Sequence, residues 1–136
     1  MSELSRLYRE SIRRHADQPV GYRRAIDATH QHEADNPQCG DRILLQMRIR
    51  EGRIEDAAFE GEACAICMAS ASLLCENVPG KPLAELENLH SRLLLALTAG
   101  PEEEAPAELK ALLGVKPYPS RIRCATLPWE AARDAL

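Results

Sequence analysis

A change of hydrophobic period in the middle of the chain restricts the fold most strongly. Apolar and polar residues alternate through 43–49, which predicts a strand with one buried face. Glu51-Gly52 is typical of a tight turn, and residues 53–59 predict the returning strand of a hairpin. The segment 64–77 is instead rich in Ala and Met and predicts a helix. A hairpin followed directly by helices is typical of the α+β class.

The residues before the hairpin predict one helix and little further regular structure. Ser2 is a candidate N-cap, and apolar residues recur at helical spacing from there to about His15. The stretch 17–35 is polar and contains Pro19 and Gly21, so it predicts an irregular segment or a short edge strand.

Three further helices and one exposed connection are predicted after the hairpin and its helix. Leucines at intervals of three and four predict an amphipathic helix over 83–97. The residues 99–104 predict an exposed acidic connection. The residues 107–113 predict a short helix with Gly114 as its C′ stop, and a final helix is predicted from near Ser120.

Pro128 interrupts the regular pattern of that final helix. Proline has no N–H, so an uninterrupted helix leaves the Cys124 carbonyl without its usual donor. Two outcomes follow: either the helix kinks, or a new helix begins with Thr126 as its cap. Both predict that Cys124 lies near a break in the helix.

Size and composition indicate a single soluble domain over residues 1–136. Hydrophobic residues make up 45% and charged residues 28% of the 136 residues, which suffices for one core. The net charge of −4 argues against nucleic acid as a partner, because phosphate binding needs a basic face. No apolar run approaches the roughly 20 residues of a membrane span, and no signal-peptide pattern opens the chain. These features therefore predict a cytoplasmic protein with no nucleic-acid or membrane partner. The order of the predicted elements predicts an α+β fold, a small antiparallel sheet with helices packed on one face.

The five cysteines indicate metal binding or thiol chemistry. An odd number suits no closed set of disulfides, and clustered cysteines in a reducing compartment are more often ligands or nucleophiles. Cys75 is the exception, because its apolar neighbours Leu73, Leu74 and Val78 predict a buried core position.

Four residues are the candidate ligands of one metal site: Cys39, Asp41, Cys64 and Cys124. Three thiolates and a carboxylate suit tetrahedral zinc, and thiolates also suit an iron–sulfur cluster. Cys39 precedes Gly40 on a predicted turn, where a thiol is accessible and can move. Asp41 has a second interpretation, as a turn residue that hydrogen-bonds its own backbone.

Cys64 stands at a predicted helix start, where the free N–H groups favour the thiolate. Cys67 follows one turn later, and the resulting C-x-x-C pattern is consistent either with metal or redox chemistry or with simple packing. No partnering ligand stands at a metal-binding interval from any histidine, so polar surface roles are predicted for His15, His30, His32 and His90.

Three motifs carry a resemblance to a known family. They are Asn36-Pro37-x-Cys39-Gly40-Asp41, then Phe59-x-Gly61-x-x-Cys64-x-Ile66-x-x-Ala69-Ser70-Ala71-Ser72, then Arg121-Ile122-Arg123-Cys124-Ala125-Thr126-Leu127-x-Trp129. In this order they resemble the U-type iron–sulfur cluster assembly proteins, the superfamily of IscU, SufU and the N-terminal domain of NifU. The resemblance runs from about Leu7 to Trp129 and includes Asp27-Ala28-Thr29-His30.

Two features are similar to the SufU branch of that superfamily. Arg123 stands where IscU-type proteins carry a histidine, and residues 100–119 resemble an insertion that SufU proteins have ahead of the last cysteine. The chain departs from the family at Cys67, where a small residue such as serine is usual, and at Pro128. We interpret Cys67 as filling space rather than binding metal.

The resemblance implies a function for this site. It implies that zinc is held by the residues Cys39, Asp41, Cys64 and Cys124, and that Cys39 accepts persulfide sulfur from a SufS-type cysteine desulfurase. It leaves two alternatives open: a scaffold on which an iron–sulfur cluster is assembled and transferred, and a purely structural zinc domain.

Overall fold

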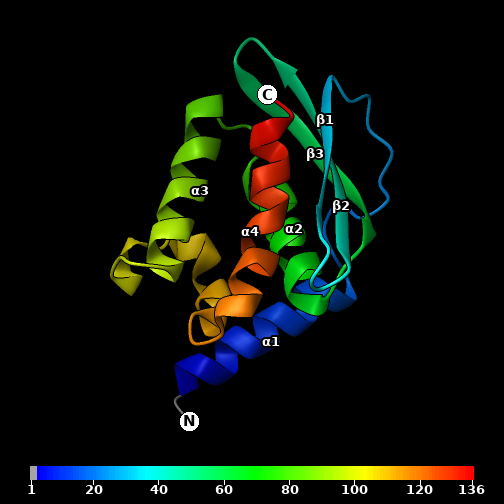
Figure 1. The fold of residues 1–136 in the computed structure, drawn as a ribbon. Helices are drawn as coiled ribbons and strands as arrows, with labels where there is room; N and C mark the ends of the chain where they lie inside the picture. Colours follow the sequence, from blue (N-terminus) through cyan, green and yellow to red (C-terminus); the bar gives the residue numbers. More distant parts are fainter. Residues whose placement is uncertain (1–2) are drawn as a thin grey trace.

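Helices and strands follow one another in the order that the hydrophobic pattern predicts (Figure 1). The computed structural model describes residues 3–136, with the backbone alone at Leu4, so the predicted cap Ser2 lies outside the described residues. The elements are α1 (Glu3–Asp17), β1 (His30–Asn36), β2 (Asp41–Arg50), β3 (Arg53–Glu62), α2 (Ala65–Asn77), α3 (Leu83–Leu97), the 3₁₀ segments η1 (Glu102–Glu104) and η2 (Ala107–Val115), and α4 (Pro119–Asp134).

The three strands form one antiparallel sheet in the order β1-β2-β3. Alternation along β2 has the predicted result, because Ile43, Leu45 and Met47 are each 0% exposed. Glu51 and Gly52 both have positive φ, 53° and 76°, as a type I′ hairpin turn requires. β1 is the edge strand anticipated within 17–35. The residues between α1 and β1, 18–29, belong to no helix or extended strand.

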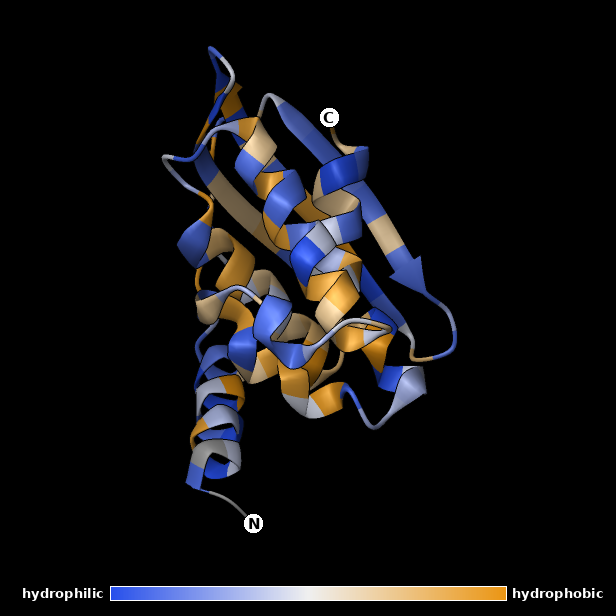
Figure 2. Cartoon of the chain, turned by 90° about the vertical axis from the view of Figure 1, so that its left-hand side faces the viewer, coloured by the Kyte–Doolittle hydropathy of each residue, from blue (hydrophilic) through white to orange (hydrophobic). Residues whose placement is uncertain are grey.

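The helices cover the apolar face of this sheet, so the predicted α+β class and layering are confirmed (Figure 1). α4 packs against β1 and β2, while α2 lies between α4 and α1. Figure 2 shows hydrophobic and hydrophilic stretches alternating along most of the helices. One continuous core joins the sheet to α2, α3, η2 and α4.

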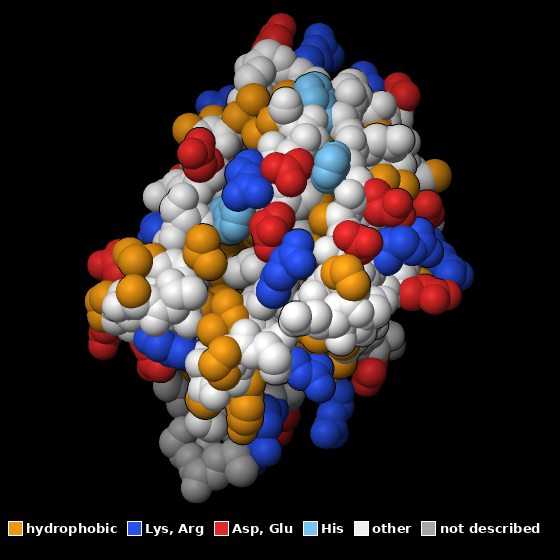
Figure 3. Space-filling view, in the orientation of Figure 1, with side chains coloured by type: hydrophobic (Ala, Val, Ile, Leu, Met, Phe, Trp, Pro, Cys, Tyr) orange, Lys and Arg blue, Asp and Glu red, His pale blue; other side chains and the backbone are white. Residues whose placement is uncertain are grey.

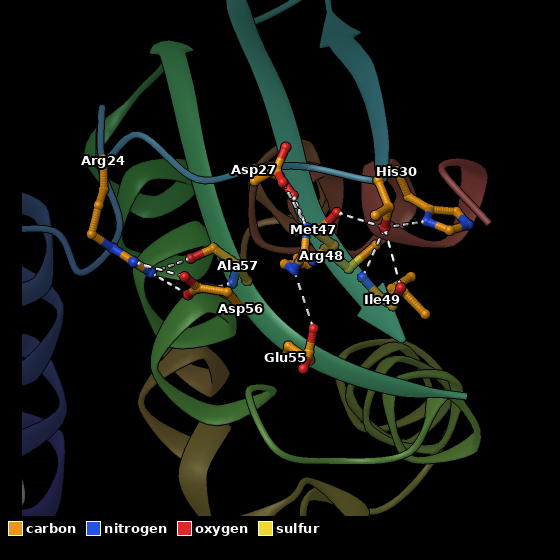
Figure 4. Close-up of polar contacts among 10 residues, drawn as sticks. Arg24, Asp27, His30, Met47, Arg48, Ile49, Glu55, Asp56 and Ala57 are labelled. Carbon is orange, nitrogen blue, oxygen red and sulfur yellow. Dashed lines mark hydrogen bonds and ion pairs between the residues drawn. The ribbon is translucent and has the colours of Figure 1, made fainter. Parts of the chain in front are cut away.

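The other face of the sheet is held by polar contacts with the irregular segment before β1 (Figure 4). Arg24 binds the Asp56 carboxylate at 2.9 Å and 2.5 Å through its two terminal nitrogens. Arg48 reaches Asp27 at 2.9 Å and Glu55 at 3.2 Å. These pairs are exposed, so they fix the path of the segment more than they stabilise the fold.

The segment 107–113 differs from its prediction. It forms a 3₁₀ rather than an α-helix, and it runs to Val115, so Gly114 is not a stop. Leu109, Leu112 and Val115 are buried at intervals of three, which matches the three residues per turn of a 3₁₀-helix. The acidic connection is exposed as predicted, with η1 inside it.

α4 continues through Pro128 as a single helix. The alternative of a second helix capped by Thr126 is therefore wrong. The Thr126 hydroxyl instead lies 3.1 Å from Glu130 Oε2, further along the same helix. Pro128 is buried, so packing of this helix face compensates for the missing N–H.

A buried serine joins α2 to α4. The Ser70 hydroxyl donates to the Ala125 carbonyl at 2.5 Å and accepts from Trp129 Nε1 at 3.0 Å. Ser70 and Trp129 are both 0% exposed, so this link fixes the relative position of the two helices one residue from Cys124.

Two histidines predicted at the surface are buried instead. His15 and His90 are each 7% exposed, whereas His32 is exposed and His30 half-buried on β1. His15 Nδ1 lies 2.7 Å from Ser72 Oγ and its Nε2 lies 3.4 Å from Glu76. Burial lowers the pKa of both His15 and His90, so each is more readily neutral than a free histidine.

Within residues 3–136 no helix has both the length and the apolar character of a membrane span.

Candidate metal centre

Cys39 lies on the turn that joins β1 to β2. Its backbone N–H donates to the Asn36 carbonyl at 3.1 Å, which closes the turn. Gly40 follows with a φ of 71°, a conformation that favours glycine and turns the chain back into β2. The Cys39 side chain is half-buried, so its thiol stays within reach of a second molecule.

Asp41 is the first residue of β2 and is 1% exposed. Its Oδ1 accepts the backbone N–H of Cys64 at 2.7 Å, and its Oδ2 lies 3.8 Å from the Cys64 thiol. The carboxylate therefore faces the start of α2, where free N–H groups favour a negative charge. Of the two interpretations of Asp41, the self-bonding turn residue is wrong, because its carboxylate bonds a distant backbone group.

Cys64 and Cys67 lie one turn apart and differ in their environment. Cys64 is the N-cap of α2, as predicted, and is half-buried. Cys67 is 0% exposed and belongs to the hydrophobic core. Burial, reinforced by the charges of Asp41, Cys64 and Cys39, raises the pKa of the Cys67 thiol well above its usual range. Cys75 is likewise in the core, where burial raises its pKa to about 12.

Cys124 comes from the middle of α4 and closes the site. It is 0% exposed, and its Sγ lies 3.4 Å from Cys39 Sγ. One ligand atom each from Cys39, Asp41 and Cys124 lies within 4.8 Å of the others. Cys64 is outside that compact group of three and joins it through Asp41.

The donor set fits a divalent cation. Burial, then hydrogen bonds with Asp41, Cys39 and Cys64, raise the pKa of Cys124 far above its usual range. Several acidic groups thus share a partly buried space, and a cation would offset the repulsion between their charged forms. Tetrahedral zinc–sulfur bonds of about 2.3 Å place ligand atoms roughly 3.8 Å apart, close to the separations seen here.

Arg123, the residue next to Cys124 in the sequence, points outward. It is exposed, and its Nε lies 3.8 Å from Glu130 on the same helix. A guanidinium has no acceptor atom, so Arg123 cannot bind a metal as a neutral histidine can. The role of Ser70 beside Cys124 does not follow from the sequence motifs, although a serine within the mostly apolar stretch 69–75 is a signal of a buried polar contact.

Comparison with known proteins agrees with the three cysteine motifs. The family model described as the NifU-like N terminal domain matches residues 7–135. The zinc-dependent sulfurtransferase SufU of Bacillus subtilis is 37% identical over 133 residues, with 96% of this chain and 89% of the relative covered. The iron–sulfur cluster assembly scaffold protein IscU of Streptococcus pyogenes is 34% identical, with 100% of this chain and 86% of the relative covered.

Solved structures agree at the level of the fold. The N-terminal NifU-like protein of Brucella abortus superposes with a TM-score of 0.86 at 25% identity, over 98% of this chain and 94% of that one. A putative scaffold protein for the SUF system from Fervidobacterium islandicum gives a TM-score of 0.80 at 27% identity, over 93% of each chain. Sequence, fold and the clustered cysteines show together that the chain belongs to the NifU-like N-terminal domain family, the U-type proteins of iron–sulfur cluster assembly.

Proposed function

We propose that this protein is a zinc-dependent sulfurtransferase that accepts persulfide sulfur from a SufS-type cysteine desulfurase for iron–sulfur cluster biogenesis. The observation that carries the proposal is the position of Cys39, a half-buried thiol on a turn beside the fully buried Cys124. The relative from Bacillus subtilis bears the name of this activity and aligns over 96% of this chain. We propose further that residues 1–136 act as one domain, which the single continuous core supports.

Zinc is the metal we propose for Cys39, Asp41, Cys64 and Cys124, where it would keep the thiols deprotonated and protected from oxidation. The buried residues Asp41 and Cys124 then act as fixed supports, while the half-buried Cys39 on its turn is the thiol that a partner can reach. Cys64 holds its place as the cap of α2.

The proposed transfer is a sulfur displacement at Cys39. The Cys39 thiolate attacks the outer, sulfane sulfur of the donor persulfide, and a new sulfur–sulfur bond forms as the donor bond breaks. The electron pair of the broken bond leaves with the donor cysteine as its thiolate. The products are a Cys39 persulfide and a regenerated donor thiolate, with no external oxidant or reductant needed.

The second candidate function is an iron–sulfur scaffold. Relatives named as IscU scaffolds from Streptococcus pyogenes and Thermotoga maritima are 34% and 32% identical to this chain, and the same thiols suit cluster ligation. Arg123 favours the sulfurtransferase over the scaffold. The residue next to Cys124 is an arginine and not a histidine, so no imidazole stands there to serve as a cluster ligand.

The deciding experiment is the rate of alanine formation by a SufS-type desulfurase with zinc-loaded protein added. We expect saturable stimulation by the unaltered protein and none by Cys39→Ala. Cys75→Ala is the matched control, because it removes a thiol from the core away from the proposed centre. Full stimulation by Cys39→Ala would refute the assignment, and a transferable cluster formed under anaerobic reconstitution without any stimulation would favour the scaffold.

A further inference from the structure

A groove adjoins the proposed centre on the side of α1. Its volume is about 710 Å³, and it is lined by α1, the start of α2, η2 and the start of α4. Ser120 forms part of its wall, and the Ser120 carbonyl oxygen lies 4.0 Å from Cys39 Sγ. A molecule seated in the groove therefore lies next to the thiol that accepts sulfur in the proposed function.

The charged residues among the described lining of the groove are both positive. Arg9 of α1 and Arg121 of α4 line it, and no aspartate or glutamate among the described residues does so. Neither arginine forms an ion pair with any residue in 3–136. This local charge contrasts with the net charge of −4 of the whole chain. Figure 3 shows basic side chains beside hydrophobic ones at the lower end of the molecule, over α1 and where α4 begins.

Apolar side chains line the groove together with the two arginines. Ile12, Ile66 and Val115 contribute aliphatic surface, and Tyr118 contributes an aromatic ring with the residue 60% exposed. Aromatic and arginine side chains on a concave surface are typical of the residues that dominate binding energy in protein interfaces.

We propose that this groove receives the persulfide-donor protein, through a segment that carries carboxylates on either side of an apolar side chain. The inference rests on the proposed function and adds the surface by which the donor is recognised. The carboxylates pair with Arg9 and Arg121, and the apolar side chain packs on the apolar side chains that line the groove. Charge complementarity carries the assignment, because two unpaired guanidinium groups in a groove without acidic residues select an anionic partner.

The experiment measures both binding and stimulation of a SufS-type desulfurase with charge-reversed variants. Arg9→Glu and Arg121→Glu alter the groove. Arg50→Glu makes the same charge change on the exposed hairpin end of β2, at the opposite end of the molecule from α1 (Figure 1). Zinc content is measured for each variant, because Arg121 lies three residues from Cys124.

We expect each groove variant to raise the dissociation constant, and the concentration that gives half-maximal stimulation, by about tenfold. The maximal rate at saturation stays unchanged, because Cys39 is intact, and Arg50→Glu matches the unaltered protein. Added salt weakens binding of the unaltered protein more than binding of Arg9→Glu.

Three results would overturn the inference. One is that both groove variants bind the desulfurase as tightly as the unaltered protein does. In that case the proposed role of Cys39 still stands if Cys39→Ala abolishes stimulation. Another is absence of desulfurase binding by the unaltered protein. The third is self-association, detected by sedimentation, that the groove variants abolish while desulfurase binding persists; this would make a second copy of the chain the occupant. If the unaltered protein binds the desulfurase in a charge-dependent way but does not stimulate it, only the proposed function is overturned.

Discussion

Asp41, at the start of β2, connects the sheet to the start of helix α2 by a hydrogen bond. One of its carboxylate oxygens accepts the Cys64 N–H at 2.7 Å, and the other faces the Cys64 thiol at 3.8 Å. The first contact stabilises the start of the helix, and the second places a negative oxygen where a metal ligand is proposed. The two contributions can be separated by substitution.

Asp41→Asn keeps an oxygen that can accept from Cys64 and removes the charge. We expect zinc affinity to fall by at least about tenfold, because a neutral amide oxygen is a weaker zinc ligand than a carboxylate. Stability of the metal-free protein should change little in Asp41→Asn, and fall by about 1–2 kcal/mol in Asp41→Ala, which also loses the hydrogen bond. Competition with a chelator and urea unfolding measure the two quantities. Unchanged zinc affinity in Asp41→Asn would remove Asp41 from the ligand set.

Cys67 is buried in the core behind the proposed centre, which supports its interpretation as a space-filling residue. We expect Cys67→Ser to leave the zinc stoichiometry unchanged. It should lower the free energy of unfolding by about 1–2 kcal/mol, since a hydroxyl is buried where a thiol packs. Metal analysis and urea unfolding test this, with Cys64→Ser as the comparison that should weaken zinc binding. A loss of bound zinc in Cys67→Ser would make Cys67 a ligand.

At the scale of residues, the sequence predicts the candidate donors but not their packing. The turn at Cys39 and the helix start at Cys64 follow from local pattern, while the approach of Cys124 to Cys39 depends on contacts between residues 85 positions apart. His15 and His90 were predicted at the surface and are buried. A polar side chain gives no periodic signal of burial when its partner, such as Ser72, lies on a distant element.

At the scale of elements, a contact between the His15 and Ser72 side chains joins α1 to α2. Ser72 accepts the Val20 N–H at 2.8 Å while it contacts His15 Nδ1 at 2.7 Å, so one hydroxyl holds both the helix and the chain that follows it. Because Glu76 lies near Nε2, a neutral His15 that donates from Nε2 and accepts at Nδ1 satisfies every partner.

This arrangement predicts a dependence of stability on pH. Burial lowers the pKa of His15 below its ordinary value of 6.5, with Glu76 opposing and Arg14 reinforcing the shift. Below about pH 6.5 the unfolded chain therefore takes up a proton more readily than the folded one, so stability is fully present above that pH and declines as the pH falls. Unfolding in urea at about pH 7.5 and about pH 5.5 should show a smaller difference for His15→Gln than for the unaltered protein.

His90 contributes with the same sign, because its pKa is also lowered by burial, so some pH dependence should remain in His15→Gln. His32→Gln, on the exposed edge of β1, is the control and should behave as the unaltered protein. An equal pH dependence in His15→Gln and His32→Gln would show that His15 does not couple folding to protonation.

Periodicity identifies most of the elements and fails where two periods compete. β2 lies where alternation predicts it, and α1 and α3 lie where helical spacing predicts them. The strand β3 was predicted from the turn before it and α2 from its composition, while the sequence left open whether the segment containing β1 was irregular or a short edge strand. The segment η2 was predicted as an α-helix because its leucines fit either period over so few residues, and only packing selects the tighter one. The continuity of α4 through Pro128 likewise depends on burial of that helix face, which no local rule contains.

At the scale of the whole molecule, most of the core consists of apolar side chains that are not proposed metal ligands. Cys124 belongs to the core and Cys39 and Cys64 pack against it, but the leucines of α3 and η2 make up a large part of the same cluster. Removal of metal should therefore leave the folded structure in place, since hydrophobic burial does not depend on the ion.

We expect zinc stripped by a chelator to lower the melting temperature without loss of the helical circular dichroism signal at room temperature. Binding to the folded state alone stabilises it by mass action, by about 4 kcal/mol at a thousandfold excess over the dissociation constant. Restored zinc should restore the melting temperature. Complete unfolding of the stripped protein would instead support the purely structural zinc domain.

Cys39 and Cys124 lie 85 residues apart, and their contact has a consequence for synthesis of the protein. The ribosome releases the turn with Cys39 and Asp41 first, then the start of α2, and the middle of α4 only near the end. A nascent chain therefore offers isolated thiols, each a weak and exchangeable ligand, until α4 packs against the sheet. Tight metal capture would coincide with the last folding step, so a prematurely terminated chain that lacks α4 would not retain the ion.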